Sequence, residues 1–441
     1  MKSVKNIIRK STLIIGLLAV VFSQVAMGQE LITLQDAIAI ALQENHGIQV
    51  AGNSAEISDN NAHIGNAGLL PRVDLLGGAT YNDNENQIAT GNRNETYTTT
   101  TAGIQVSYTL FEGLGNIYTY KKLNSMSAYG ALQARATIEQ SLVQVSNAYF
   151  TVAEVTENLR LANESLAISL ERLERARNRS KFGQANTIEV LSAEVDLNAD
   201  SVSYINAKLA LDQAKRDLNV LLNRNIKTDF SVDSRVQFEK KFDLVRLLKS
   251  AEQKNASYLM YVNGVTQSEY DVKIAQSAYL PKLDLLSSYG YNQQGTELDI
   301  ALDNSNRTFS AGVSLSFNLF NGFQNSIKKQ NAKIELKNKQ LLCDEALLSL
   351  KSNVTNVYQA YRNSLYVLEV EQKNLESAQL NFTRTKELYD LGQVTTTQFR
   401  EAQLNLIRAK NSIANAKYNA KLYEIELLRQ SGELVKTNEY N

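Results

Sequence analysis

Apolar residues recur at three- and four-residue intervals over two very long stretches of the chain. Residues 131–182 contain neither glycine nor proline, and the same holds for residues 323–391. Between Leu142 and Leu173, ten positions at this spacing include eight apolar side chains, and the matching positions at an offset of 209 include seven. This spacing predicts long amphipathic helices that pack as in coiled coils. At about 1.5 Å of rise per residue, about 60 residues form a helix roughly 90 Å long.

Four shorter stretches alternate apolar and polar residues instead. Their apolar faces consist of Val73, Leu75, Ala79 and Tyr81; Ala102, Ile104, Val106, Tyr108 and Leu110; Leu283, Leu285, Tyr289 and Tyr291; and Ala311, Val313, Leu315, Phe317 and Leu319. A period of two predicts β-strands with one apolar and one polar face. Each pair of stretches encloses a polar loop, NDNENQIATGNRNET in the first and NQQGTELDIALDNSNR in the second.

The chain is an internal duplication. LPRVDLLGGATYN at 70–82 aligns with LPKLDLLSSYGYN at 280–292, and LFEGLGN at 110–116 aligns with LFNGFQN at 319–325. The first offset is 210 and the second 209, so the segment between the two motifs is one residue shorter in the second copy. The only two prolines, Pro71 and Pro281, occupy the same place in both copies. Proline disfavours helix at the preceding residue, which predicts a helix-to-strand junction at each.

These patterns predict a mainly α fold with membrane β structure, built from two repeats of a long helical hairpin plus two strands. The expected segments are a signal peptide at 1–28; repeat 1 at 29–222, with strands at about 72–82 and 100–111 and long helices at about 114–182 and 187–222; a linker at 223–242; repeat 2 at 243–430, with strands at about 282–292 and 309–320 and long helices at about 323–390 and 395–430; and a C-terminal tail at 431–441.

The segment from Met1 to Gly28 has a basic start, an apolar centre and small residues near its end, the order of a secretory signal peptide. The whole chain has 46 basic and 46 acidic residues, and the predicted peptide carries four of the basic ones and no acidic one. The exported protein would therefore have a small acidic excess, which gives no indication of nucleic-acid binding. Cys343 is the only cysteine, so no disulfide framework is expected.

The alternating strands fit either a half-buried sheet of a soluble protein or a membrane β-barrel. Export and the polar loops between the strands favour the barrel. Four strands cannot close a barrel, and an open sheet edge in lipid would leave backbone groups without hydrogen-bond partners. Several chains would therefore have to share one barrel.

In its repeat order, its LP(R/K)xDL motifs and its LF(E/N)G motifs, the chain resembles the TolC family of outer-membrane efflux proteins. The resemblance covers essentially the whole mature chain. It implies a homotrimer with one twelve-stranded barrel in outer-membrane lipid and a helical tunnel in the periplasm of a Gram-negative bacterium. It also implies a periplasmic adaptor and an inner-membrane transporter as partners in efflux or type I secretion. The tunnel-to-barrel junctions would contain Pro71, Pro281, Phe111, Gly113, Phe320 and Gly322.

The resemblance further implies two sites near the hairpin tips. The adaptor contacts would be Phe182, Gly183, Gln184, Leu391, Gly392 and Gln393. Beyond the second tip, family members often carry two acidic residues that narrow the pore. Here these positions are Gln398 and Glu401, with Glu189 at the corresponding point of the first copy, so the sequence departs from a two-tier acidic gate. A ring of Glu401 side chains would favour cations, and a solvated charge on the helix surface is the alternative.

No motif for catalysis, phosphate binding or zinc binding is present, so neither enzymatic activity nor a cofactor is expected. His46 and His63 both lie on the opening helical pattern of the first copy and are interpreted as solvated or packed side chains rather than a metal pair. Passive conduction from an inner-membrane transporter to the exterior is the predicted function. The alternative is a soluble periplasmic coiled-coil adaptor or scaffold, which long hairpins alone would also permit.

Overall fold

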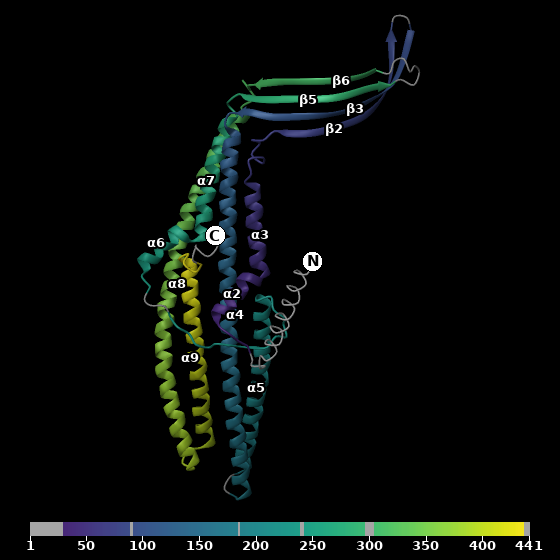
Figure 1. The fold of residues 1–441 in the computed structure, drawn as a ribbon. Helices are drawn as coiled ribbons and strands as arrows, with labels where there is room; N and C mark the ends of the chain where they lie inside the picture. Colours follow the sequence, from purple (N-terminus) through teal and green to yellow (C-terminus); the bar gives the residue numbers. More distant parts are fainter. Residues whose placement is uncertain (1–29, 89–90, 184–185, 239–241, 296–303, 436–441) are drawn as a thin grey trace, which may run out of the picture. The chain divides into compact units, whose positions relative to one another are not determined.

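The computed structural model describes residues 30–88, 91–183, 186–238, 242–295 and 304–435, and the predicted signal peptide lies outside them (Figure 1). The helices are α2 (Leu34–Glu44), α3 (His46–Asn61), α4 (Gly115–Lys181), α5 (Thr187–Leu221), α6 (Leu244–Lys254), α7 (Ala256–Ser277), α8 (Gln324–Asp390) and α9 (Thr396–Gln430). The strands are β1 (Glu30–Ile32), β2 (Arg72–Ile88), β3 (Gly91–Glu112), β4 (Phe230–Val232), β5 (Lys282–Gly295) and β6 (Asn304–Ser316). Among the described residues, no helix combines the length and the apolar character needed to cross a membrane.

The duplication holds at the level of helix boundaries. The helices α2 and α6 begin at Leu34 and Leu244, an offset of 244 − 34 = 210. The helices α4 and α8 begin at Gly115 and Gln324, an offset of 324 − 115 = 209. The two offsets found in the motifs therefore carry over to the fold, with 210 before and 209 after the residue that the second copy lacks.

The two compact units of the chain do not coincide with its two repeats. Within the described residues, unit 1 lies in the ranges 30–46, 141–238 and 359–426, and unit 2 lies in the ranges 47–140, 242–358 and 427–435. Each unit takes segments from both repeats, because the long helices α4 and α8 contribute residues to both units. The repeats are thus defined by the sequence, whereas each packed unit combines corresponding segments of both repeats.

In unit 1, the inter-repeat linker forms β4, which pairs in parallel with β1 in the register Ile32↔Val232. Tyr149 on α4 anchors this small sheet, because its hydroxyl oxygen lies 3.0 Å from the carbonyl oxygens of both Ile32 and Asp233. Burial raises the pKa of Tyr149 to about 12, so the phenol stays protonated and can donate a hydrogen bond at neutral pH.

Unit 2 contains a four-stranded sheet in the order β2-β3-β5-β6, with every neighbouring pair antiparallel (Figure 1). The register places Leu75 opposite Ile104, Ile104 opposite Tyr289, and Tyr289 opposite Phe309. Most apolar residues of the four strands therefore share one face of the sheet. Gln105 and Ser288 pair on the opposite, mainly polar face, which also carries Leu76 and Leu286.

The strands differ from the sequence prediction in three respects. All four extend into residues expected to form polar loops, with β5 reaching Gly295 and β6 beginning at Asn304, because ladder hydrogen bonds do not require apolar side chains. A bulge between Thr109 and Phe111 removes Leu110 from the pairing, and Phe111 pairs with Leu283 in its place. β6 ends at Ser316 rather than at about residue 320, so Phe317 and Leu319 lie beyond the strand.

The helix-to-strand junctions are built alike in both repeats. Pro71 directly precedes β2, and Pro281 directly precedes β5. After the second strand of each β-hairpin, two consecutive residues adopt positive φ. They are Gly113 (57°) with Leu114 (68°), and Gly322 (62°) with Phe323 (66°). A left-handed conformation is costly for a residue with a side chain, so its presence at both Leu114 and Phe323 marks a turn that the surrounding structure imposes.

An asparagine side chain closes each junction. The Nδ2 of Asn116 donates to the carbonyl oxygen of Gly68 at 3.1 Å, and the Nδ2 of Asn325 donates to the carbonyl oxygen of Ala278 at 3.1 Å. These are the last residues of the LFEGLGN and LFNGFQN motifs, and their acceptors lie three residues before Pro71 and Pro281. The two repeated motifs therefore meet in space, and the asparagine joins the start of the long helix to the segment that leads into the first strand.

A second pair of asparagines holds the ends of the long hairpins. In unit 1, the Nδ2 of Asn45 donates to the carbonyl oxygen of Leu221 at 2.7 Å. In unit 2, the Nδ2 of Asn255 donates to the carbonyl oxygen of Gln430 at 3.0 Å, while its Oδ1 accepts from the backbone nitrogen of Tyr258 at 2.9 Å. Each asparagine thereby satisfies a carbonyl at a helix C-terminus, one of the groups that helix geometry leaves unpaired.

Replacing Asn255 by alanine should destabilise the protein. The change removes the N-cap of α7 and leaves the Gln430 carbonyl without this donor. A loss of about 1–3 kcal/mol is expected, measured as a lower thermal unfolding midpoint of the detergent-purified protein. Asn331→Ala, at an exposed position of α8, is the matched control. Equal midpoints for the two variants would contradict the assigned role of Asn255.

Candidate functional site

Both hairpin tips in unit 1 end their first helix at a glycine with positive φ, Gly183 at 71° and Gly392 at 73°. The backbone nitrogen of Gly392 donates to the carbonyl oxygen of Tyr389 at 3.0 Å, and that of Gln393 donates to the carbonyl oxygen of Leu388 at 2.8 Å. This hydrogen-bond pattern is a Schellman motif, which needs a left-handed residue and therefore favours glycine. The predicted contact residue Gln184 lies outside the described residues.

The tips expose apolar side chains. Phe182 and Leu391, at corresponding positions of the two repeats, are 78% and 72% exposed. Solvation of two large apolar side chains is unfavourable, so the tips present them at a cost to the isolated chain.

Gln398 is the N3 residue of a helix cap. Its Oε1 accepts from the backbone nitrogen of Thr395 at 2.9 Å, and its own backbone nitrogen donates to the Thr395 hydroxyl oxygen at 3.3 Å. This reciprocal arrangement is a capping box, which satisfies unpaired groups at the start of α9. The side-chain amide of Gln398 therefore caps the N-terminus of α9, directly after the tip turn.

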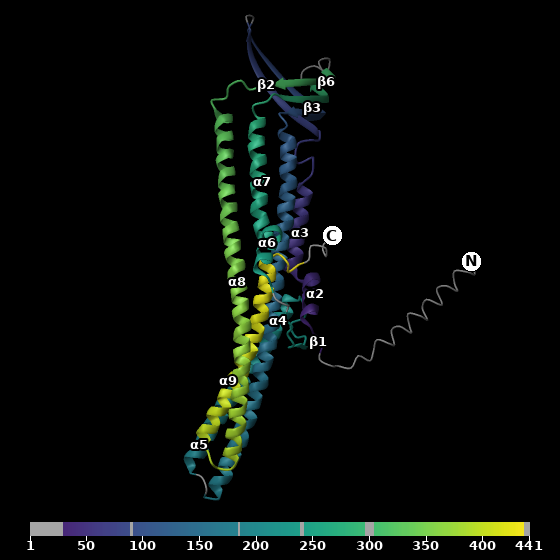
Figure 2. The same ribbon diagram turned by 90° about the vertical axis from the view of Figure 1, so that its left-hand side faces the viewer.

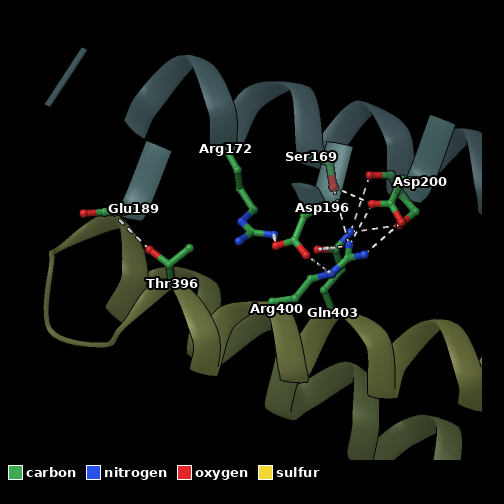
Figure 3. A network of polar contacts seen from close by, with 9 residues as sticks. Ser169, Arg172, Glu189, Asp196, Asp200, Thr396, Arg400 and Gln403 are labelled. Carbon is green, nitrogen blue, oxygen red and sulfur yellow. Dashed lines mark hydrogen bonds and ion pairs between the residues drawn. The ribbon is translucent and has the colours of Figure 1, made fainter. Parts of the chain in front are cut away.

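Glu189 occupies the corresponding position of the first repeat, since 398 − 189 = 209, but it makes different contacts. Its Oε1 lies 3.0 Å from Nη1 of Arg179 on α4. The same oxygen accepts a hydrogen bond from the Thr396 hydroxyl on α9 at 3.1 Å (Figure 3). Glu189 therefore joins the first hairpin tip to the second. Glu401, the third predicted pore residue, lies exposed on α9.

The strongest polar contacts near the tips involve a residue that sequence reasoning missed, Arg400. Its Nη1 lies 2.7 Å from Oδ2 of Asp200, and its Nη2 lies 2.9 Å from Oδ1 of the same carboxylate (Figure 3). Nε of Arg400 lies 3.7 Å from Oδ1 of Asp196. The bidentate contact to Asp200 fixes both the distance and the orientation of the two groups, and it joins α9 to α5.

The neighbouring residues extend this contact to α4. Arg172 donates through Nη1 to Oδ2 of Asp196 at 3.0 Å, and the Ser169 hydroxyl donates to Asp200. Nε2 of the buried Gln403 on α9 lies 3.1 Å from the Ser165 hydroxyl oxygen on α4. We call Ser165, Ser169, Arg172, Asp196, Asp200, Arg400 and Gln403 the three-helix polar cluster.

The three-helix polar cluster keeps the Asp200 carboxylate in its charged form. Burial raises the pKa of Asp200, but hydrogen bonds from Arg400 and Ser169 outweigh burial and bring the pKa below its ordinary value. Removing one partner of a buried ion pair lowers protein stability by more than the net contribution of the pair, because the other charge is left buried without a partner. The cluster therefore penalises any arrangement that separates α9 from α5.

Aromatic side chains pack beside the cluster. Tyr389 on α8 stacks on Phe399 on α9, with a centroid distance of 4.6 Å and an interplanar angle of 14°. Arg175 on α4 lies 5.1 Å from the centroid of the Tyr389 ring and pairs with Asp390 at 2.5 Å. The second hairpin is thus attached to the first by stacking and charge together.

A cleft of about 920 Å³ lies between the two hairpin tips of unit 1. Its apolar lining includes the exposed Ile188, Leu191 and Val195, which recur at three- and four-residue spacing on α5. Its polar lining includes Arg400, and it reaches Gly392 at the second tip. An amphipathic helix or loop of a partner could contact such a surface.

The missed residues did carry a signal in the sequence. Ser165, Ser169 and Arg172 lie at intervals of four and three residues, and Asp196 and Asp200 are four apart. Polar residues that follow the helical period can form one face of a helix and meet opposite charges on another. The location of the partner, Arg400, could not be read from local spacing.

No metal site is found in the portion of the chain that the structure describes, where no three histidine, cysteine or acidic side chains come together suitably. His63 accepts a hydrogen bond at Nδ1 from the backbone nitrogen of Gly65 at 3.1 Å, within a local turn. His46 is the first residue of α3.

The fold has a counterpart among solved structures. The structure of the CmeC outer membrane channel of Campylobacter jejuni superposes with a TM-score of 0.78 at 18% identity, over 92% of this chain and 87% of that one. This chain therefore has the same fold as that structure, with long helical hairpins interrupted by paired strands.

The sequence identifies the family. The pattern of the outer membrane efflux protein family matches twice, over residues 37–224 and 247–433, and the chain belongs to this family. The probable outer membrane lipoprotein SilC of Salmonella typhimurium is 22% identical over 408 residues, covering 90% of this chain and 84% of the relative. The outer membrane protein TolC of Escherichia coli is 22% identical over 391 residues, covering 83% of this chain and 75% of TolC.

These comparisons confirm the predicted TolC-like fold of two repeats, the outer-membrane location with a periplasmic helical part, and the class of function. An outer-membrane efflux or secretion channel is supported over a soluble periplasmic adaptor. The family is one of channel proteins rather than enzymes.

Replacing Asp200 by asparagine should destabilise the hairpin tips. The variant keeps one hydrogen-bond acceptor but leaves the mostly buried Arg400 without its bidentate carboxylate. The expected loss is about 1.5–3 kcal/mol, seen as a lower thermal midpoint. Glu401→Gln is the matched control, because it removes the same charge at the exposed neighbour of Arg400.

The effect should also depend on pH. Because the pKa of Asp200 is lowered in the folded protein, its contribution is present at neutral pH and is lost as the pH falls from about 4 towards the lowered value. The stability difference between the wild type and the variant should therefore be constant from pH 7 to pH 5 and shrink below about pH 4. A difference unchanged at low pH would contradict the ion-pair assignment.

Proposed function

We propose that three copies of this chain form a passive conduit from a periplasmic adaptor and an inner-membrane transporter to the cell exterior. Their twelve strands would form one barrel in outer-membrane lipid, and their long helices would surround a periplasmic tunnel. The observation that carries the proposal is a sheet with one apolar face and two open edges in a single chain.

The apolar face of the sheet supports contact with lipid. Val73, Leu75, Phe309, Val313 and Leu315 all lie on this face, and each is at least 60% exposed. A soluble protein rarely presents a contiguous apolar surface of this kind. The opposite face carries Thr101, Ser288 and Ser310, and a hydrogen bond of 2.8 Å joins the last two hydroxyl groups. Apolar outside and polar inside is the pattern of an outer-membrane barrel wall.

The sheet edges support assembly from several copies. β2 and β6 are the outer strands, so one row of backbone groups on each has no strand partner among the described residues of the chain. In hydrocarbon, each unpaired backbone group would cost several kcal/mol. Closure through copies of the same sheet satisfies these groups without any additional protein.

The tips support contact with an adaptor. Phe182, Gly183, Leu391, Gly392 and Gln393 present two exposed apolar side chains beside glycine turns. The cleft between the tips adds the apolar face of α5 to this surface. Burial of these side chains on binding would favour association. AprF, an alkaline protease secretion protein of Pseudomonas aeruginosa, is a relative whose name places it in secretion.

Of the three predicted pore residues, only Glu401 is proposed to face the pore where it narrows. Gln398 is engaged in capping α9, and Glu189 contacts both Arg179 and Thr396. Glu401 is exposed on α9 and adjoins Arg400, whose own charge is compensated by Asp200. Three Glu401 carboxylates around a threefold axis would concentrate negative charge where the helices converge, which favours cations over anions.

Placing a charge on the apolar face should prevent assembly. Val313→Arg would put a guanidinium in the lipid-facing band, at a cost of about 2–4 kcal/mol near the bilayer midplane. Membrane fractionation and native electrophoresis should show loss of the outer-membrane oligomer. Ser316→Arg, on the polar face, is the matched control and should assemble. Similar assembly of both variants would contradict a membrane-facing surface.

Neutralising Glu401 should reduce ion selectivity. In planar bilayers under a potassium chloride gradient, Glu401→Gln should shift the reversal potential towards zero, because most of the cation preference is lost with the carboxylate ring. Glu387→Gln, which removes an exposed charge from α8 near the same tip, is the control. An unchanged reversal potential for Glu401→Gln would leave this residue as a solvated surface charge.

A further inference from the structure

Two leucines of the sheet depart from the alternation of apolar and polar side chains. Leu76 on β2 pairs with Gly103, and Leu286 on β5 pairs with Ser107. Both leucines therefore lie on the mainly polar face, where their side chains are 53% and 46% exposed. Apart from glycines and Tyr97, the other residues on this face are polar or charged over the ranges 72–84, 97–109, 282–294 and 306–316.

The two leucines occupy the same place in the two repeats. Their offset is 286 − 76 = 210, and each is the fifth residue of its strand, since β2 begins at Arg72 and β5 begins at Lys282. The preceding helices, α3 and α7, run to the same end of the sheet (Figure 2). Leu76 and Leu286 therefore lie at the same distance along their strands from the helical part.

A glycine lies opposite each leucine within its β-hairpin. Leu76 pairs with Gly103 and Leu286 pairs with Gly312, and these two glycines are themselves counterparts, since 312 − 103 = 209. An added Cβ at Gly312 would meet nothing within 4 Å, so the space beside Leu286 is open. An added Cβ at Gly290, which pairs with Gly103, would meet only backbone atoms within 4 Å. Each leucine thus borders a part of the sheet where an apolar group from outside the chain can lie against it.

The sheet itself does not require leucine at these positions. Backbone hydrogen bonds form the ladder whatever the side chain, and Gly78 and Ser288 occupy the next positions along the same face. A leucine side chain that stays in water keeps its apolar surface solvated, which is unfavourable. The presence of such a residue at the same place in both repeats therefore indicates a contact made by another molecule.

The charged side chains near the leucines are paired with one another. Asp74 and Asp284 lie two residues before the leucines on the same face. Nε of Arg72 lies 2.9 Å from Oδ1 of Asp74, and Nζ of Lys282 lies 3.3 Å from Oδ2 of Asp284. The Thr109 hydroxyl donates to Oδ1 of Asp284 at 2.7 Å. Both carboxylates are thus compensated, so apolar contact rather than charge distinguishes this part of the sheet.

We propose that Leu76 and Leu286 form an apolar ring on the inner wall of the barrel, which binds the alkyl chain of an amphiphilic small molecule in transit. The inference rests on the proposed assembly, in which the polar face of the sheet surrounds the lumen. Since each copy contributes two leucines at the same level, three copies would present six. An amphiphile fits this wall because its polar group can remain hydrated beside the polar residues while its alkyl chain covers a leucine.

Cysteine modification tests the leucine ring. In a Cys343→Ser background, Ser288→Cys places a thiol two residues after Leu286 on the same face, and Asn306→Cys places one further along this face, at the level of Asn292. Oligomers in isolated outer membranes are treated with methanethiosulfonates that carry a trimethylammonium group on an ethyl or a hexyl chain. Mass spectrometry gives the rate constant of modification for each reagent, and the ratio of the hexyl to the ethyl rate constant is compared between the two sites.

The ratio should be about tenfold higher at Ser288→Cys than at Asn306→Cys, because half-burial of four additional methylene groups corresponds to about that factor. Replacing both Leu76 and Leu286 by serine should make the two ratios equal. Leu76→Met with Leu286→Met is the matched control. Methionine keeps a similar apolar volume, so this variant should retain the preference for the hexyl reagent.

Each variant is first examined by native electrophoresis in detergent. An intact oligomer with equal ratios at the two cysteine sites, or with a preference that survives the change to serine, would overturn the leucine ring while leaving the proposed function in place. If the serine variant does not assemble, the comparison of the two cysteine sites with both leucines present still decides between these outcomes. A protein that is monomeric in every background would contradict the proposed assembly itself.

Discussion

A backbone amide or carbonyl group in hydrocarbon must have a hydrogen-bond partner, and the arrangement of this chain depends on that constraint. Among the described residues, the four strands pair with each other in the order β2-β3-β5-β6, which leaves the outer edges of β2 and β6 without a strand partner. In the proposed assembly, other copies of the same sheet would supply partners for these two edges.

The helical part meets a different constraint, because water is present and charges can be exposed or buried. Most charged side chains on the long helices lie on solvated surfaces, but Arg400, Asp200 and Arg172 do not. Their burial is stable only while α4, α5 and α9 remain together, so the cluster makes the separation of these helices costly. The stacking of Tyr389 on Phe399 supports the same arrangement by apolar contact.

Periodicity was sufficient to predict most of the backbone. Glycine-free helical stretches, alternating strands and two repeated motifs located the long helices and strand pairs, because each depends on local sequence. The bulge that removes Leu110 from the ladder could not be predicted, since it depends on a distant partner strand, where Thr109 contacts Asp284. Arg400 was missed for a similar reason: within α9 it has the spacing of a surface charge, and only the packing of α5 against α9 buries it.

The two repeats have the same backbone arrangement but different side chains near the hairpin tips. This difference would affect how the tips of the proposed tunnel move apart. The counterparts of Arg400, Asp200 and Ser169 in the other repeat are Leu191, Ala409 and Ala378. In the proposed trimer, the contact between the two helical hairpins of one chain would contain the three-helix polar cluster. The contact between hairpins of neighbouring chains would be apolar at the corresponding positions. Leu191 is exposed in the single chain, as expected for a residue whose partner belongs to another copy. An apolar contact can slide with little change in energy, whereas a bidentate ion pair is sensitive to orientation. Movement at the tips would therefore occur first between chains, with each pair of hairpins moving as one body.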